Sequence, residues 1–217
     1  MMTYHGKVTP GRPAVRELAE LVITKAAVGS MDNNAYLLST RNSEELLLID
    51  AAAEPAVLLE LVGGRSLTTV VTTHRHRDHW LALSEVVATT GAETVAGDAD
   101  ADGIPVDTVR RVADGDTIEV GDLSFSVIHV VGHTPGSIAL LYDDPDGPPH
   151  LWTGDSLFPG GVGRTTSPED FRSLIHDVET KLFDRLPDET WVYPGHGDDT
   201  TLGAERPHLH EWRTRGW

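Results

Sequence analysis

Histidine and aspartate are concentrated in one short segment of this sequence. Four residues between positions 74 and 79 can bind a metal ion: His74, His76, Asp78 and His79. His74 and His76 are two positions apart, so they project to the same side of an extended loop, whereas Asp78 and His79 can face a second point. Imidazole and carboxylate groups suit zinc, iron and manganese. The segment therefore predicts a metal site with room for two neighbouring ions.

Three other segments carry the same residue types in similar surroundings. Each follows a predicted strand and places glycine beside the histidine or aspartate: Gly132-His133-Thr134-Pro135-Gly136, Thr153-Gly154-Asp155-Ser156 and Pro194-Gly195-His196-Gly197. Loops at strand ends often carry functional groups, and glycine lets the backbone approach an ion closely. We predict that seven side chains converge on one site: His74, His76, Asp78, His79, His133, Asp155 and His196.

Short strands and helices alternate along the chain and would position these loops. Runs of β-branched or alternating apolar residues predict strands at 21–26, 35–39, 45–50, 67–73, 93–96, 109–112, 117–120, 124–131, 137–142, 151–153 and 191–193. Helical spacing predicts helices at 55–62, 81–90, 168–186 and near 202–213, the last interrupted by Pro207. This mixture indicates α/β or α+β layers, and 217 residues fit a single domain spanning 1–217.

Composition restricts the partners. The formal net charge is −17, from 34 acidic and 17 basic residues, so most of the surface would repel a phosphate backbone, which argues against nucleic acid. There is no cysteine, which excludes disulfides, thiolate ligands and cysteine nucleophiles. No apolar run approaches the roughly 18 residues of a membrane span, and the N-terminus lacks the pattern of a signal peptide. We expect a cytoplasmic protein that acts on a small-molecule substrate, with no membrane partner, and the sequence indicates no oligomeric state.

Other titratable residues receive plainer interpretations. Six histidines lie outside the matching clusters, and we expect them to be structural or exposed to solvent: His5, His129, His150, His176, His208 and His210. Asp50 ends an apolar strand, where it either holds a ligand histidine in place or is an ordinary turn residue.

The ordered residues resemble the metallo-β-lactamase-fold hydrolases, in which the motif H-x-H-x-D-H is followed by separate His, Asp and His residues. The resemblance spans nearly the whole chain and implies a four-layer αββα sandwich with the metals at one edge. It also implies the ligand sets. One metal would take His74, His76 and His133, and the other Asp78, His79 and His196, with Asp155 bridging the two.

Within that superfamily the sequence looks most similar to glyoxalase-II-like thioester hydrolases. The similarity lies in two pairs of segments: Asp155-Ser156-Leu157-Phe158 with Gly161-Val162-Gly163-Arg164, and Pro194-Gly195-His196-Gly197 with Thr200-Thr201-Leu202-Gly203. The sequence ends 21 residues after His196. We therefore expect no counterpart of the C-terminal helical domain that helps to bind glutathione in the longer glyoxalase II enzymes, and the thiol carried by the substrate stays open.

The chemistry expected of such a site is hydrolysis by water that the metals activate. Two divalent cations lower the pKa of a bridging water from 15.7 to roughly 7, so hydroxide forms near neutral pH. Asp78 would bind one metal and orient this water, and Asp155 would bridge. A thiolate with a pKa near 8.5 can leave without a proton, which favours thioesters and lactones over amides. Zinc is the default metal, and iron or manganese suits the same ligands. Arg164 either binds a substrate carboxylate or is an ordinary surface arginine.

Several other functions compete with this hypothesis. A persulfide dioxygenase would use a single iron, held by His74, His76 and Asp155 or with His133 joining them. A lactonase would use the same metal pair on another ester. A true β-lactamase is disfavoured because an exported protein, or a cysteine in place of Asp155, would be expected, and a nuclease is disfavoured by the net charge. A metal-binding interaction protein without catalysis is the remaining alternative.

Overall fold

The computed structural model describes residues 4–216, and the first half of the chain forms a seven-stranded mixed sheet. The strand order is β1-β2-β3-β4-β5-β6-β7, with antiparallel pairs from β1 to β4 and parallel pairs from β4 to β7. Parallel neighbours need crossover connections, and the helices between these strands supply them. The strands are β1 (Ala14–Glu17), β2 (Leu21–Val28), β3 (Asn33–Thr40), β4 (Glu45–Ile49), β5 (Ser66–Thr72), β6 (Glu93–Gly97) and β7 (Arg110–Val112).

The second half forms a six-stranded sheet and a small hairpin. The order in the sheet is β15-β14-β11-β10-β9-β8, and its pairs are antiparallel except for β11 with β14. The strands are β8 (Thr117–Val120), β9 (Leu123–His129), β10 (Ile138–Tyr142), β11 (His150–Gly154), β14 (Trp191–Pro194) and β15 (Thr200–Thr201). The hairpin consists of β12 (Leu157–Phe158) and β13 (Gly161–Val162).

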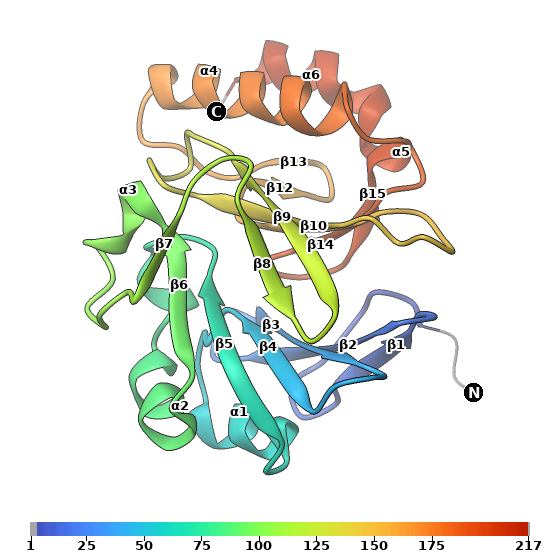
Figure 1. Ribbon diagram of the computed structural model, residues 1–217. Helices are drawn as coiled ribbons and strands as arrows, with labels where there is room; N and C mark the ends of the chain where they lie inside the picture. Colours follow the sequence, from blue (N-terminus) through green and yellow to red (C-terminus); the bar gives the residue numbers. More distant parts are fainter. Residues whose placement is uncertain (1–3, 217) are drawn as a thin grey trace.

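The two sheets pack face to face, and helices cover their outer faces (Figure 1). The first sheet carries α1 (Pro55–Val62), α2 (Leu83–Thr90) and the short α3 (Asp98–Ala101). The second carries α4 (Pro168–Asp177), a π-helical segment (Val178–Phe183), α5 (Leu202–Glu205) and α6 (Leu209–Arg215), and the 3₁₀ turns are Arg77–His79 and Arg206–His208. The result is the four-layer αββα sandwich that the sequence predicts, so the predicted fold class is confirmed.

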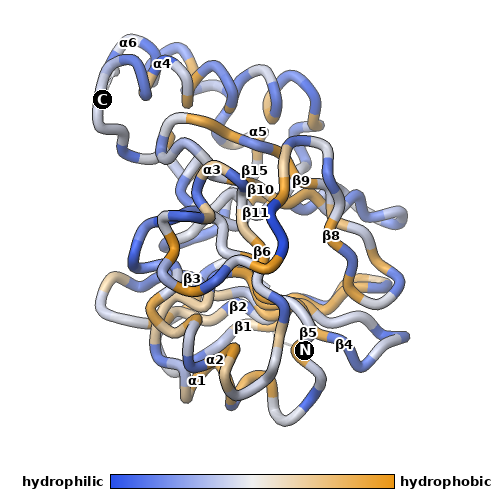
Figure 2. Tube along the Cα trace, turned by 60° about the vertical axis from the view of Figure 1, so that its left-hand side comes forward, coloured by the Kyte–Doolittle hydropathy of each residue, from blue (hydrophilic) through white to orange (hydrophobic). Residues whose placement is uncertain are grey.

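Strand β5 shows why its β-branched run belongs in the middle of this sandwich. Successive side chains of a strand point to opposite faces. Val70 packs in the cluster beneath α1 and α2, and Val71 packs between the two sheets, where Phe125 and Trp152 also lie. Figure 2 shows the hydrophobic stretches concentrated in the strands, whereas α4 and α6 are largely hydrophilic. A strand covered on both faces needs apolar residues at nearly every position.

The structure corrects several predicted boundaries. The predicted helix 168–186 is α4 followed by the π-helical segment, in which Asp184 N–H donates to the carbonyl of Glu179, five residues back. Hydrophobic spacing over six residues does not separate the two helix types. The predicted helix 81–90 begins at Leu83, and the predicted strand 124–131 is β9. The last helical stretch is divided at Pro207, as expected. Strands β1, β12, β13 and β15 and helix α3 were not predicted.

No helix within residues 4–216 is long and apolar enough to cross a membrane.

Candidate metal centre

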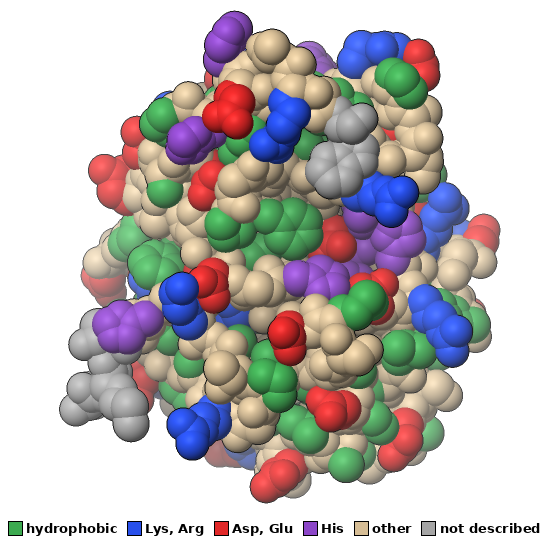
Figure 3. Space-filling model, turned by 180° about the vertical axis from the view of Figure 1, so that it is seen from behind, with side chains coloured by type: hydrophobic (Ala, Val, Ile, Leu, Met, Phe, Trp, Pro, Cys, Tyr) green, Lys and Arg blue, Asp and Glu red, His purple; other side chains and the backbone are tan. Residues whose placement is uncertain are grey.

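All seven predicted ligands lie together at one edge of the sandwich. They come from the loops that follow β5, β9, β11 and β14. Figure 3 shows histidine and acidic side chains adjoining one another on one face of the molecule. Two separate groups of ligand atoms each lie within 4.8 Å of one another: His74, His76 and His133, and Asp78, His79 and His196. A third set at the same spacing, His74, His79 and Asp155, draws one histidine from each group and so links them. The structure therefore brings together every residue of the predicted site, and metal binding by them stays a prediction.

The first group places three imidazole nitrogens at the spacing that one cation requires. His133 Nε2 lies 2.9 Å from His76 Nδ1 and 3.2 Å from His74 Nε2. Nitrogen ligands at 2.0–2.1 Å around a tetrahedral metal are roughly 3.3 Å apart. The other ring nitrogens of His74 and His133 face oxygen acceptors: His74 Nδ1 donates to Thr73 Oγ1 at 3.1 Å, and His133 Nδ1 donates to the Arg164 carbonyl at 2.6 Å. These hydrogen bonds turn both Nε2 atoms inward.

The second group combines one carboxylate with two histidines. Asp78 Oδ2 lies 3.2 Å from His196 Nε2 and 3.5 Å from His79 Nε2. His79 Nδ1 donates to Asp50 Oδ2 at 2.8 Å, and His196 Nδ1 donates to the Met31 carbonyl at 3.1 Å. Both rings therefore present Nε2 toward Asp78.

Asp155 lies between the two groups. Its Oδ1 is 3.4 Å from His79 Nε2. Its Oδ2 is 3.5 Å from His133 Nε2 and 3.6 Å from His196 Nε2. One carboxylate thus faces donors of both groups, as a bridging ligand would.

Two buried atoms of this site have no hydrogen-bond partner in the described structure. They are His79 Nε2 and Asp155 Oδ1. Leaving a buried polar atom unpaired costs about 1–3 kcal/mol, and native structures usually avoid it. A cation between these atoms would satisfy both, so the residues present fit a divalent metal.

The charge states of the two groups differ. Burial lowers the pKa of His74, His76 and His133, which are therefore neutral and able to donate a lone pair. For His79 and His196 burial also lowers the pKa, but carboxylates outweigh it and raise the pKa of each to about 10: Asp50 and Asp155 act on His79, and Asp155 and Asp78 on His196. Without a metal, the positive charges of the protonated His79 and His196 rings offset the negative charges of these carboxylates. A metal cation would have to displace both protons in order to bind.

Asp50 holds the predicted ligand His79 in place, which agrees with the first of the two interpretations that the sequence left open. It is buried, and besides His79 it accepts hydrogen bonds from Thr73 N–H and Thr73 Oγ1, both at 2.8 Å. Because Thr73 Oγ1 accepts from His74 Nδ1, Asp50 supports ligands of both groups.

Sequence reasoning missed three polar residues that support predicted ligands or the loop that carries His196. Asn33 donates to Asp78 Oδ2 at 2.9 Å, and Asn34 donates to the Pro194 carbonyl at 2.9 Å. Lys25 is fully buried and donates to the Gly197 carbonyl at 2.7 Å. A lysine within the largely apolar strand β2 and two asparagines at the start of β3 were the available signal, because buried polar groups need partners.

Arg164 and His150 occupy different surroundings. Arg164 is exposed, and its contact with the site is its backbone carbonyl on His133. His150 is buried away from the cluster, and its Nδ1 lies 2.9 Å from Tyr193 Oη, consistent with its expected structural role.

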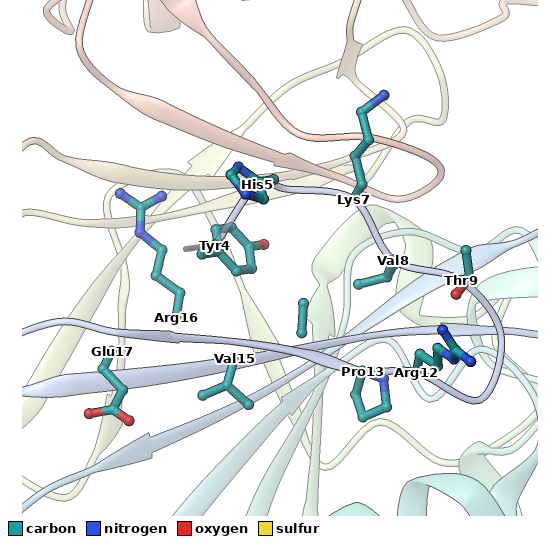
Figure 4. A pocket seen from close by; sticks show the side chains of 11 residues that line it. Tyr4, His5, Lys7, Val8, Thr9, Arg12, Pro13, Val15, Arg16 and Glu17 are labelled. Atoms are coloured by element: carbon teal, nitrogen blue, oxygen red, sulfur yellow. The ribbon is translucent and has the colours of Figure 1, made fainter. Parts of the chain in front are cut away.

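A hollow of about 820 Å³ lies away from the seven predicted ligands, between residues 4–9 and β1 (Figure 4). Its lining includes none of the seven predicted ligands.

Comparison with known families and relatives gives a consistent result. The family model for the metallo-beta-lactamase superfamily matches residues 28–196. An uncharacterized protein of Aquifex aeolicus is 31% identical over 202 residues, covering 86% of this chain and 94% of that protein. A hydroxyacylglutathione hydrolase of Fuscovulum blasticum is 39% identical over 170 residues, covering 76% of this chain and 62% of that protein.

Solved structures share the fold. The BLEG-1 B3 metallo-beta-lactamase has a TM-score of 0.76 at 25% identity, covering 86% of this chain and 97% of that one. ETHE1 from Myxococcus xanthus has a TM-score of 0.74 at 30% identity, covering 86% and 82%. TTHA1623, solved in a di-iron-bound form, has a TM-score of 0.69 at 30% identity, covering 84% and 96%.

Proposed function

The chain belongs to the metallo-β-lactamase superfamily, and we propose that within it this protein is a thioester hydrolase of the glyoxalase-II-like type that uses two divalent metal ions. The observation that carries the proposal is a pair of complete donor groups that face one shared carboxylate, Asp155. A site for a single metal would need only one of these groups. The 39% identity to a hydroxyacylglutathione hydrolase supports the choice of substrate class.

The residues divide the work of such a reaction among them. Two divalent cations, when bound, supply Lewis acidity that lowers the pKa of water and polarises a carbonyl. Asp78 is partly exposed, so it can reach both a ligand and solvent water, and we assign it the orientation of the attacking water. Asp155 is more deeply placed and holds the two groups together. A thiolate leaves without a proton, so the site needs no separate general acid for a thioester.

The substrate we propose is a small molecule, and zinc is the metal we propose first. The net charge of −17 disfavours a polyanionic partner. Imidazole and carboxylate ligands without thiolate suit zinc, but they also suit iron, and TTHA1623 was solved in a di-iron-bound form. Arg164 is exposed on the loop that contacts His133, and we assign its guanidinium to a carboxylate of the substrate.

Metal analysis combined with thioester turnover tests this proposal. Freshly purified protein is analysed for metals, stripped with a chelator, reloaded with zinc and assayed with S-lactoylglutathione. We expect two metals per chain and hydrolysis that returns only on reloading. Asp155→Asn should abolish turnover, whereas Asp144→Asn, a change to a buried aspartate outside the site, should retain it. Two bound metals without thioester hydrolysis would reject the substrate class, and hydrolysis of a lactone in the same preparation would assign a lactonase.

A mononuclear-iron persulfide dioxygenase is the second candidate. The likeness to ETHE1 at 30% identity favours it, and His74, His76 and Asp155 or His133 would hold the iron. The test is oxygen uptake with glutathione persulfide by the iron-loaded protein. One iron per chain together with uptake that depends on the persulfide would replace the hydrolase proposal.

A further inference from the structure

Asp100 is a buried carboxylate outside the seven predicted ligands. It lies in α3, directly after β6, and its side chain is 0% exposed. We propose that Asp100 is a positioning residue that fixes two ligand-bearing loops against each other and thereby sets the metal affinity of the group formed by His74, His76 and His133. The inference rests on the proposed two-metal function and deepens it.

The hydrogen bonds of Asp100 reach both loops. Its Oδ2 accepts from the backbone N–H of Arg75 at 3.0 Å and from the hydroxyl of Thr134. Its Oδ1 accepts from the backbone N–H of Gly136 at 2.9 Å, and Arg75 Nε is 3.7 Å away. Arg75 stands between His74 and His76, and Thr134 follows His133. One carboxylate therefore connects the backbones that carry all three histidines.

The backbones around Asp100 are packed too closely to drift independently. A Cβ on Gly136 would lie 2.3 Å from the backbone nitrogen of Asp100, and a Cβ on Gly97 would lie 2.1 Å from the Gly136 carbonyl oxygen. A Cβ on Gly103, which follows α3, would lie 2.8 Å from Cδ of Arg75. The two contacts with backbone atoms leave room only for glycine, whereas the third would displace the Arg75 side chain. The start of α3 is thus the surface on which both loops rest.

The three-histidine group is sensitive to this arrangement because its donors come from both loops. Functional metal sites keep ligand distances within about 0.2 Å. The separation between His76 Nδ1 and His133 Nε2, 2.9 Å, depends on the relative placement of the loops that Asp100 joins. The ring orientations of the second group depend on other residues, since His79 is held by Asp50 and His196 by the Met31 carbonyl. Loss of Asp100 should therefore weaken one metal site more than the other.

The test is the substitution Asp100→Asn in the full chain, followed by titration of the metal-free protein with Zn²⁺ and with Co²⁺. Asparagine keeps the size of the side chain but replaces one acceptor oxygen with an amide donor, which faces donors already present. We expect one of two binding steps to weaken roughly 10–100-fold, the usual effect of losing a partner that supports a ligand, and the other to change by less than about threefold. The visible Co²⁺ spectrum of the weakened site should change as well.

Two further variants identify the affected site and the cause. In a His133→Ala background, which removes one ligand of the three-histidine group, Asp100→Asn should have little additional effect, because changes acting on one site do not add. The matched control is Asp144→Asn: Asp144 is also buried and accepts a backbone N–H, that of Asp146 at 3.1 Å, but it lies between β10 and β11, outside the loops that carry the predicted ligands. It should leave both binding steps unchanged.

The outcomes separate this inference from the proposed function. Two unchanged binding steps in Asp100→Asn would overturn the inference and leave the hydrolase proposal standing. Equal weakening of both steps, matched by Asp144→Asn, would also overturn it, because it would indicate general loss of structure. A wild-type protein that takes up no metal would overturn both. If Asp100→Asn does not fold, Thr134→Val is the alternative, because it removes one hydrogen bond to Asp100. It should weaken the same single binding step by about 3–10-fold, since it removes only part of the support for the ligand loops. An unchanged metal affinity in Thr134→Val would then reject the inference.

Discussion

Gly195 has no room for even a methyl group, because two predicted metal ligands, Asp155 and His79, lie against it. A Cβ at this position would lie 2.2 Å from Asp155 Oδ1 and 2.7 Å from His79 Cε1. Because Cβ atoms essentially never approach closer than 3.0 Å, the Asp155 carboxylate would have to retreat by at least 0.8 Å. Ligand positions in metal sites tolerate only about 0.2 Å. We therefore expect Gly195→Ala to weaken zinc binding roughly 10–100-fold and to lower turnover about 100-fold.

Gly197 provides the matched control two residues away. It has a φ of 71°, and no atom lies within 4 Å of the place that an added methyl group would take, so Gly197→Ala strains the backbone without touching a ligand. That strain costs about 1–3 kcal/mol of stability. Zinc affinity by chelator competition, S-lactoylglutathione hydrolysis and the urea unfolding midpoint are measured for both variants. Gly197→Ala should lose stability but keep zinc affinity. Gly195→Ala protein with wild-type zinc affinity and turnover would refute the reasoning.

Three other predictions follow from the same geometry. Asp50→Asn removes the anionic partner of His79 and should weaken zinc binding roughly 10–100-fold in a chelator competition; an unchanged affinity would contradict this. Arg164→Ala should raise KM about tenfold for thioesters bearing a carboxylate and leave kcat unchanged, because the contact with His133 is made by the backbone; an equal rise for a neutral thioester would remove the role. Burial lowers the pKa of His150 to about 3. The unfolded chain therefore binds more protons between pH 6.5 and 3, and stability should fall by about 1.4 kcal/mol per pH unit as the pH drops through this range. Urea unfolding of wild type and His150→Asn at pH 7 and 4.5 checks it, and identical acid losses would refute the assignment.

The convergence of the seven predicted ligands could be anticipated from sequence because each signal is local. A β-branched run predicts a strand, and the His or Asp that follows it is placed at the strand's end by chain connectivity alone. His133, Asp155 and His196 each follow a strand in the same sheet, although β9 ends two residues earlier than predicted. The layered fold followed from the alternation of elements together with the family resemblance. Predicting the layered fold and the convergence of the ligands did not require knowing which residues distant in the sequence are in contact.

The supporting residues could not be anticipated, because their roles depend on which segments meet in space. Asp100 acts on a residue 25 positions earlier and on another 36 positions later. In the sequence it stands in a run of aspartates and alanines that also suits a solvated turn. Asn33 lies 163 residues from His196, and nothing in its neighbours indicates that pairing. The π-helical segment was missed for a related reason, since its extra residue per turn is not visible in six residues of hydrophobic pattern.

The turn that carries His196 shows how the two sheets share the site. It leaves β14 of the second sheet, yet its carbonyls are bound by side chains of the first. The Pro194 carbonyl accepts from Tyr36 Oη at 2.6 Å and from Asn34, and the Gly197 carbonyl accepts from Asn34 at 3.0 Å and from Lys25. Burial lowers the pKa of Lys25, so keeping it charged there is costly.

The buried ion pair between Lys25 and Asp199, at 2.6 Å, offsets part of that cost. A hydrophobic pair of similar volume would often be at least as stable, so stability alone does not explain a lysine at this place. The position of Lys25 explains it, because the ammonium group donates to Gly6, Gly197 and Asp199. These hydrogen bonds tie the turn after His196 to the first sheet. An apolar side chain would fill the space without fixing the carbonyl. We therefore interpret Lys25, Asn34 and Tyr36 as the support that keeps His196 in position relative to the predicted ligands supplied by the first half of the chain.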